Sequence, residues 1–184
     1  NRLIHLVENV LSVSKMNASS EVLKKVDVNE VIKRIIPMFT EQYKTRKFVQ
    51  KLNSNLPPAR LDEDKFQQIL TNLIDNAAKY STDGKTVTIS TELVENFVEM
   101  KITDEGVGIK KEDFDKIFKK FSRLENHLTS TTQGNGLGLY ITKQLVENMG
   151  GQISFTSEIN KGTTFKVLMP VYNQEEVLRC SHKS

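Results

Sequence analysis

The 184-residue chain contains a single cysteine, Cys180, close to its C-terminus. One cysteine excludes an intramolecular disulfide and fits a protein that stays in a reducing compartment. No apolar run reaches the roughly 18 residues that a membrane-spanning helix requires, and the first residues do not have the pattern of a secretory signal. We therefore expect this chain neither to cross a membrane nor to be exported.

The chain also lacks a strong excess of charge of either sign. Its 26 basic and 23 acidic residues give a net charge of +3, and the two signs are interleaved along the sequence. A nucleic-acid-binding protein needs a basic stripe along which phosphates can lie, so no nucleic-acid partner is expected. The length is sufficient for one domain with a buried core and an appended helix.

The most informative segment covers residues 67–81. In a helix, Asn72, Asn76 and Lys79 would share one face, because they are four and three residues apart. Two amide oxygens can ligate a hard cation such as Mg²⁺, and a lysine adds a positive charge for phosphates that the cation also binds. The alternative is an ordinary solvated helix face. The opposite, apolar face consists of Phe66, Ile69, Leu70, Leu73 and Ala77.

A predicted strand with alternating apolar residues, 97–103, leads to Asp104. A carboxylate at the end of a strand can accept a hydrogen bond from an amine such as N6 of adenine. Gly106 and Gly108 follow, and without a Cβ they allow the main chain to approach a ring closely. Because Asp-Glu-Gly is also common in turns, a plain loop is the alternative.

Three glycines, Gly134, Gly136 and Gly138, precede a predicted helix that ends near Gly150. Free N–H groups and the positive end of the helix dipole bind anions, so this junction predicts a phosphate site. It is not a dinucleotide fingerprint, because no buried strand precedes it, and it is not a Walker A loop, because no Gly-Lys-Ser/Thr follows. The core face of this helix consists of Leu137, Ile141, Leu145 and Met149.

Four motifs occur in a characteristic order: the Asn-rich helix, Asp-x-Gly-x-Gly, Phe-Lys-Lys-Phe at 118–121, and Gly-Asn-Gly-Leu-Gly-Leu at 134–139. Over residues 26–170 this order resembles the ATP-binding domain of sensor histidine kinases. The resemblance implies the Bergerat fold that gyrase, Hsp90 and MutL share, with ATP and Mg²⁺ as cofactors. It also implies transfer of the γ-phosphoryl group of ATP to a histidine, for onward transfer to a response regulator.

The resemblance further implies roles for individual residues. Asn76 would ligate Mg²⁺ with Asn72 beside it, and Lys79 would contact phosphate. Asp104 would accept a hydrogen bond from adenine N6, and Arg123 would lie near the terminal phosphate. Phe118 would help to anchor the start of a lid. The other residues expected to contact the nucleotide are Tyr80, Gly106, Gly108, Ile109, Phe121, Gly134, Gly136, Leu137 and Gly138, of which Phe121 would also anchor the lid.

The lid itself is predicted at residues 124–133, which have no hydrophobic periodicity and lie between two predicted phosphate-site motifs. A loop of this length without secondary structure is usually a functional lid or a flexible segment. A nucleotide-dependent lid is the favoured interpretation, and plain flexibility is the alternative.

Residues 1–17 have a two-row apolar stripe suited to a helical bundle. They resemble the end of the second helix of the family's dimerisation and phosphoacceptor hairpin; a helix packed on its own domain is the alternative. His5 is not followed by the acidic residue and Leu-Arg-x-Pro that the family's acceptor histidine has, and neither His127 nor His182 fits. We therefore expect a part of a longer kinase that does not include the phosphoacceptor.

These patterns divide the chain into four parts. On the resemblance, residues 1–17 would be the end of the hairpin, 18–25 a linker, 26–172 the ATP-binding catalytic domain and 173–184 a polar tail. The partners that the resemblance implies are the phosphoacceptor hairpin of the same or a partner protomer and the receiver domain of a response regulator. The parent protein would be a homodimer, and this chain the cytoplasmic portion of a membrane-anchored sensor.

The expected fold is an α/β (α+β) two-layer sandwich with a mixed, mostly antiparallel sheet and helices on one face. A helix that begins near Asn29 contains Pro37, which predicts a kink or an earlier end, and Asp62 should cap the helix of the predicted site. Strands are expected at 26–28, 48–52, 86–93, 97–103, 151–157 and 163–170, the last two joined by a hairpin turn.

Three functions are compatible with the motifs: a kinase that phosphorylates a histidine, an ATPase switch on the same fold, and a nucleotide-binding module without turnover. A hydrolase needs a base for water, and relatives such as gyrase place a glutamate one helical turn before the Mg²⁺-binding asparagine. Asn72 occupies that position, and an amide cannot accept a proton at neutral pH. The sequence favours the kinase, because all four motifs are present and the N-terminal helix indicates the sensor class.

Overall fold

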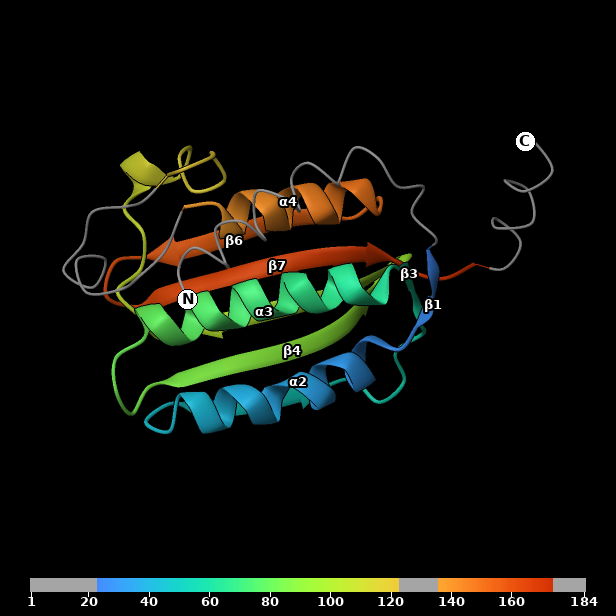
Figure 1. Ribbon diagram of the computed structural model, residues 1–184, viewed down its shortest axis with the longest axis horizontal. Helices are drawn as coiled ribbons and strands as arrows, with labels where there is room; N and C mark the ends of the chain where they lie inside the picture. The colour runs from blue at the N-terminus through green and yellow to red at the C-terminus, as the bar shows by residue number, and fades with distance from the viewer. Residues whose placement is uncertain (1–22, 123–135, 174–184) are drawn as a thin grey trace.

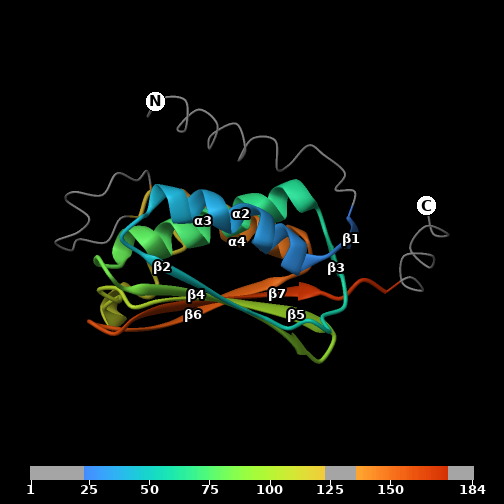
Figure 2. The same ribbon diagram turned by 90° about the horizontal axis from the view of Figure 1, so that it is seen from below.

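The computed structural model describes residues 23–122 and 136–173 and consists of two layers. Three helices lie side by side on one face of a five-stranded sheet (Figure 1, Figure 2), which confirms the predicted sandwich. In these two ranges no helix is long and apolar enough to cross a membrane. The predicted helix at 1–17 and the predicted lid at 124–133 lie outside the described residues. The α-helices are α2 (Val28–Gln42), α3 (Glu63–Tyr80) and α4 (Gly138–Asn148), and a short 3₁₀ helix, η1, covers Lys111–Asp113.

The five-stranded sheet has the strand order β2-β4-β5-β7-β6. β2 is parallel to β4, and every other neighbouring pair is antiparallel, so the sheet is mixed and mostly antiparallel as predicted. A second sheet pairs β1 with β3 in an antiparallel arrangement. The strands are β1 (Lys24–Val26), β2 (Lys47–Leu52), β3 (Ala59–Leu61), β4 (Thr86–Val94), β5 (Phe97–Asp104), β6 (Gln152–Glu158) and β7 (Gly162–Pro170).

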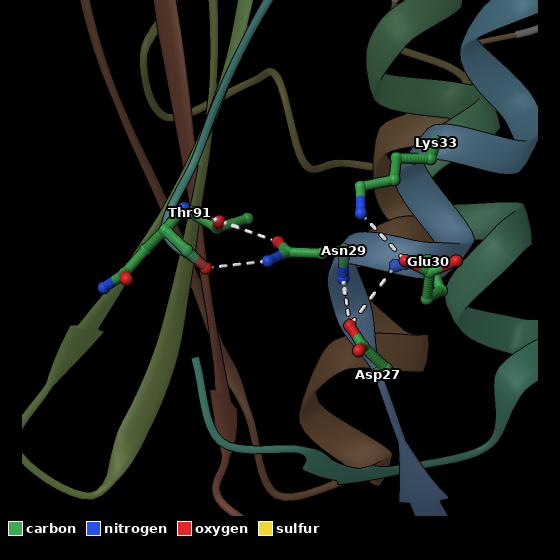
Figure 3. Close-up of polar contacts among 6 residues, drawn as sticks. Asp27, Asn29, Glu30, Lys33 and Thr91 are labelled. Atoms are coloured by element: carbon green, nitrogen blue, oxygen red, sulfur yellow. Dashed lines mark hydrogen bonds and ion pairs between the residues drawn. The ribbon is translucent and has the colours of Figure 1, made fainter. Parts of the chain in front are cut away.

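The first strand is displaced from its predicted position at 26–28. β1 ends at residue 26 and includes the last two residues of the predicted linker, 24 and 25. The strand ends there because Asp27 caps the following helix: its carboxylate accepts hydrogen bonds from the backbone N–H groups of Asn29 (2.9 Å) and Glu30 (3.3 Å) (Figure 3). α2 therefore begins directly after Asp27.

α2 continues through Pro37, where the sequence predicted a kink or an end. Pro37 lies on the exposed side of the helix, whereas Ile32, Ile36 and Phe39 on the other side are buried in the core. Packing of that buried face sustains the helix despite the missing backbone donor. β3 was not predicted, because three residues are too few to show an alternating pattern.

A buried polar link joins α2 to the sheet. The Asn29 side chain donates a hydrogen bond to the backbone carbonyl of Asn53 (2.8 Å) and accepts one from the hydroxyl of Thr91 (2.8 Å) (Figure 3). Because each polar group has a partner, the link can be buried without a large desolvation penalty. Much of the remaining buried interface is apolar. It includes the predicted apolar face of α3, Phe66, Ile69, Leu70, Leu73 and Ala77, all at most 2% exposed.

Candidate functional site

α3 is the central helix of its layer, between α2 and α4 (Figure 1). It begins at Asp62, whose carboxylate accepts a hydrogen bond from the backbone N–H of Lys65 (3.1 Å), so the predicted cap is confirmed. Asn72, Asn76 and Lys79 are half-buried, in contrast to the fully buried apolar face. The helix therefore presents two amides and an ammonium group together, away from the core.

α4 lies against this polar face at its N-terminal end. The amide nitrogen of Asn72 is 3.4 Å from the hydroxyl of Thr142, and a Cβ on Gly138 would lie 3.7 Å from the amide oxygen of Asn72. Among the α-helices of the described ranges, α2 and α3 have an aspartate cap, whereas Leu137, the N-cap residue of α4, gives no side-chain cap. The side chain at the N-cap position therefore offers no acceptor to the first N–H groups of α4, and N–H groups at a helix start can bind an anion, here beside Asn72.

Gly136 holds the start of α4 against the segment that precedes residue 123. Its φ is +66°, and a Cβ would lie 2.7 Å from the backbone of Phe121 and Ser122, so a side chain there would be strained. The ring of Phe118 packs edge-on against Phe155, with centroids 6.0 Å apart. Phe121 is 68% exposed, and its φ of +59° turns the chain at this point. The lid that both phenylalanines were predicted to anchor lies outside the described residues, so this role stays a prediction.

The carboxylate of Asp104 ends β5 and is buried, with 5% of the residue exposed. Its Oδ1 accepts hydrogen bonds from the backbone N–H groups of Gly106 (2.9 Å) and Thr163 (3.2 Å). Burial raises the pKa of Asp104 from 3.8 to about 6, although both hydrogen bonds act in the opposite direction. The group is therefore a fixed and poorly solvated acceptor.

The two glycines after Asp104 are required by close backbone contacts. A Cβ on Gly106 would clash with the carbonyl oxygen of Tyr80, and one on Gly108, at φ +69°, would clash with that of Glu158. Between them, the N–H of Val107 donates a hydrogen bond to the Tyr80 carbonyl (3.2 Å). The turn is thus fixed between the end of α3 and the β6–β7 turn, which places the carboxylate close to the last turn of α3.

Two residues that support this turn were not predicted from the sequence. Thr163 donates its N–H to Asp104, and its hydroxyl lies 2.9 Å from that of Ser157. Ser157 in turn accepts a hydrogen bond from the N–H of Ile109 (2.8 Å), and Ile109 is half-buried. The sequence feature that could have indicated this support is Gly162. Its φ is +112° and it lies against the backbone carbonyl of Asp104, so β7 can begin beside the Asp104 side chain.

The chemistry of the described side chains limits how a metal could bind. In residues 23–122 and 136–173, no group of three or more His, Cys, Asp or Glu side chains could hold a metal ion. A cation near the polar face of α3 would instead depend on the amide oxygens of Asn72 and Asn76 and on oxygens of a bound ligand, which fits Mg²⁺ with a nucleotide. Arg123 and Gly134 lie outside the described residues.

Comparison with known proteins finds relatives that match the helices and strands of the site. A family model described as "Histidine kinase-, DNA gyrase B-, and HSP90-like ATPase" matches residues 61–173. The signal transduction histidine-protein kinase ArlS of Staphylococcus haemolyticus is 35% identical over 170 residues, which are 91% of this chain and 38% of the relative. ArlS of Staphylococcus aureus (strain USA300) is 36% identical over 170 residues with the same coverage. The chain thus spans 38% of the length of these relatives.

Solved structures agree with these matches. The Acinetobacter baumannii histidine kinase AdeS is similar with a TM-score of 0.76 and 27% identity, over 93% of this chain and 79% of that chain. Full-length ShkA in complex with AMPPNP is similar with a TM-score of 0.80 and 25% identity, over 92% and 36%. Both the predicted Bergerat fold and the resemblance to sensor histidine kinases are confirmed. The chain belongs to the family of histidine kinase-, DNA gyrase B- and HSP90-like ATPases.

Proposed function

We propose that this chain is the ATP-binding catalytic part of a sensor histidine kinase and transfers the γ-phosphoryl group of ATP to a histidine of a dimerisation hairpin. The observation that carries the proposal is the arrangement around the polar face of α3. The N-terminus of α4, to which Leu137 gives no side-chain cap, lies beside Asn72, and the buried carboxylate of Asp104 lies close to the last turn of α3. The AMPPNP complex of a protein with the same fold supports nucleotide binding at such a site.

The adenine end of the proposed site is the turn after β5. Both backbone donors to Asp104 bind its Oδ1, so Oδ2 is the oxygen that we assign to the adenine N6 amine. The glycine backbone at 106 and 108 has no Cβ between the turn and a flat ring. Tyr80 and Ile109, from α3 and the turn, would contact the nucleotide at the rim of this pocket.

The phosphate end is the junction of α3 and α4. Asn76 and Asn72 would hold Mg²⁺ through their amide oxygens, and Lys79 would contact a phosphate directly. The N–H groups at the start of α4, with the glycines at 134, 136 and 138, would bind phosphate oxygens through the backbone. When bound, Mg²⁺ neutralises charge on the phosphates, and the protein contributes mainly by positioning. Arg123 is proposed to lie near the terminal phosphate.

Kinase activity is favoured over an ATPase switch because of Asn72. Its amide takes the place of the general base that hydrolysis requires, and in the structure this amide faces Thr142 and Gly138 on α4 rather than a carboxylate. Bound ATP would therefore survive until a histidine nucleophile reaches it.

The remaining parts of the proposal concern the parent protein. Residues 1–17 are assigned to the end of the dimerisation hairpin, 18–25 to a linker, 26–172 to the catalytic domain and 173–184 to a polar tail. The acceptor histidine is assigned to a part of the parent outside this chain, in line with relatives of more than twice its length. The parent would be a membrane-anchored homodimer with this portion in the cytoplasm, and it would pass the phosphoryl group to a receiver domain.

The assignment of Asn76 as a Mg²⁺ ligand predicts that Asn76→Ala loses affinity for ATP only when magnesium is present. In magnesium, ATP binding should weaken by about tenfold or more, as expected when a ligand of the ion is removed. In chelator, the change should be small, because the lost interaction runs through the ion. Calorimetric titration of ATP in both conditions measures the difference. Asn148→Ala, an exposed amide at the far end of α4, is the matched control. Equal losses in both conditions would return Asn76 to a structural role.

The raised pKa of Asp104 predicts weaker adenine binding in acid. A protonated carboxyl no longer offers a charged acceptor to N6, so adenosine affinity should decrease as the pH falls below about 6, by up to about tenfold per pH unit. Adenosine is the suitable probe, because the phosphates of ATP titrate near the same pH. Binding can be followed by NMR between about pH 5 and about pH 7.5, with Asp104→Asn as a control that should show no such dependence. A constant affinity across this range would contradict the assignment.

A further inference from the structure

The polar face of α3 carries a fourth residue, Asp75, that the predicted site did not include. Its Oδ2 forms an ion pair with the ammonium group of Lys79 one helical turn further along; the two side chains are 25% and 32% exposed. Its Oδ1 accepts a hydrogen bond from the hydroxyl of Tyr43 (2.6 Å). The two oxygens of one carboxylate thus connect Lys79 to a residue 32 positions away from Asp75 in the sequence.

Tyr43 is itself held firmly. It is the C-cap residue of α2, its N–H donates a hydrogen bond to the carbonyl of Phe39 (2.8 Å), and its ring packs against the core. Burial, and next the hydrogen bond to Asp75, raise the pKa of the Tyr43 hydroxyl above its ordinary value, so it remains a neutral donor at physiological pH. The charge of Arg46 and a hydrogen bond with Gln42 act in the opposite direction but are smaller effects.

The nearby cation, Arg46, does not take the place of Lys79. Its guanidinium donates to the backbone carbonyls of Ala78 (3.2 Å) and Ser81 (2.8 Å) and pairs with Asp83. Arg46 therefore binds the C-terminal end of α3, and the carboxylate of Asp75 remains assigned to Tyr43 and Lys79.

A lysine at a half-exposed helix end would otherwise sample many rotamers, because its four-carbon chain is flexible. Ordering such a side chain when a ligand binds costs affinity, and a partner that orders it beforehand removes that cost. The ammonium group has three N–H donors, so a bond to Asp75 leaves donors for a phosphate. We infer that Tyr43 and Asp75 are positioning residues that hold the Lys79 ammonium group in place for a phosphate of the nucleotide. This inference rests on the phosphate contact of Lys79 in the proposed function.

An opposite effect of Asp75 is conceivable on charge alone, since a carboxylate repels the phosphates of ATP. Removing Asp75 would change both the charge and the position of Lys79, so its effect on affinity mixes the two. Tyr43→Phe separates them: it removes only a neutral hydroxyl, keeps the packed ring and leaves the net charge of the site unchanged. The carboxylate then loses its fixed partner, and Lys79 loses its fixed position.

The test measures binding of AMPPNP with magnesium and of adenosine to the same variants by calorimetry. Tyr43→Phe should weaken AMPPNP binding by about two- to tenfold, the range expected for ordering one long side chain, and leave adenosine binding unchanged. In a Lys79→Ala background, the further change Tyr43→Phe should have no effect on AMPPNP binding, because Tyr43 is inferred to act on the phosphate only through Asp75 and Lys79. Tyr172→Phe, at a half-buried tyrosine close to the end of the described residues, is the matched control, and thermal unfolding verifies that each variant is folded.

Each of the following outcomes would overturn the inference. Tighter AMPPNP binding in Tyr43→Phe would mean that Asp75 withholds Lys79 from the phosphate. If Tyr43→Phe weakened adenosine binding as much as AMPPNP binding, or weakened AMPPNP binding equally in the Lys79→Ala background, Tyr43 would act only on the fold. If Lys79→Ala weakens AMPPNP binding and Tyr43→Phe has no effect, the positioning inference alone fails. If Lys79→Ala itself leaves AMPPNP binding unchanged, the phosphate contact in the proposed function fails as well.

Discussion

Asp104→Asn is expected to weaken ATP binding by at least about tenfold, the scale of a lost hydrogen bond to a charged group. Asparagine keeps an oxygen that can accept the two backbone hydrogen bonds from Gly106 and Thr163, so the turn after β5 is preserved. Its other group is an NH₂ donor. This donor would face the donating N6 amine of adenine, and a site built to bind an amine discriminates strongly against such a mismatch.

The same variant should be more stable than the original chain when no nucleotide is present. At neutral pH the folded state contains an ionised, buried carboxylate, and the raised pKa of Asp104 shows that burial disfavours that charge. Removing the charge should increase the free energy of unfolding by up to about 3 kcal/mol, the equivalent of a pKa raised from 3.8 to about 6. The gain should disappear as the pH falls towards about 4, because the carboxyl group of the original chain is then protonated when folded.

Calorimetry with ATP and GTP tests the predicted loss of affinity. Denaturant unfolding at neutral pH and at about pH 4 tests the predicted gain in stability. Loss of binding in a more stable protein cannot be attributed to misfolding, which makes this pair of results informative. Asp115→Asn, at an exposed position, is the matched control and should change neither quantity. Unchanged ATP affinity in Asp104→Asn, or equal affinities of the original chain for ATP and GTP, would contradict the assignment of Asp104 to adenine.

Local sequence patterns were sufficient to predict the helix of the site. The apolar face of α3 is defined by spacing along one helix, so its buried side could be predicted without knowledge of the rest of the fold. The Asp62 cap likewise depends on a contact three residues away. The strands of the main sheet were found for the same reason, since alternation is a local property.

Contacts between distant parts of the chain could not be predicted in this way. Thr163 supports Asp104 across 59 residues, and Tyr43 holds Asp75 across 32, so both depend on how the strands and helices are arranged. The passage of α2 through Pro37 also depends on tertiary packing, which outweighs the local effect of proline on the helix. In each case the residue type is ordinary, and only the fold gives it a partner.

The chain with Mg²⁺ and ATP is expected not to label itself with phosphate but to label a separately supplied phosphoacceptor hairpin of its parent. Phosphoryl transfer is catalysed mainly by positioning and charge stabilisation, so a site that holds ATP without an aligned nitrogen nucleophile has no group to phosphorylate. His5 does not have the sequence context of an acceptor, and it should be inert. Label should therefore be found on the supplied hairpin and be absent from the chain incubated alone.

Incubation with γ-labelled ATP and magnesium, with and without the hairpin, is the measurement that tests the kinase assignment most directly. Acid-labile label is predicted on the hairpin, and none on the chain alone. The Asp104→Asn variant, as a control, should label the hairpin at a strongly reduced rate at limiting ATP. Failure of the chain to label the hairpin, or acid-labile label on the chain alone that disappears in His5→Ala, would contradict the account.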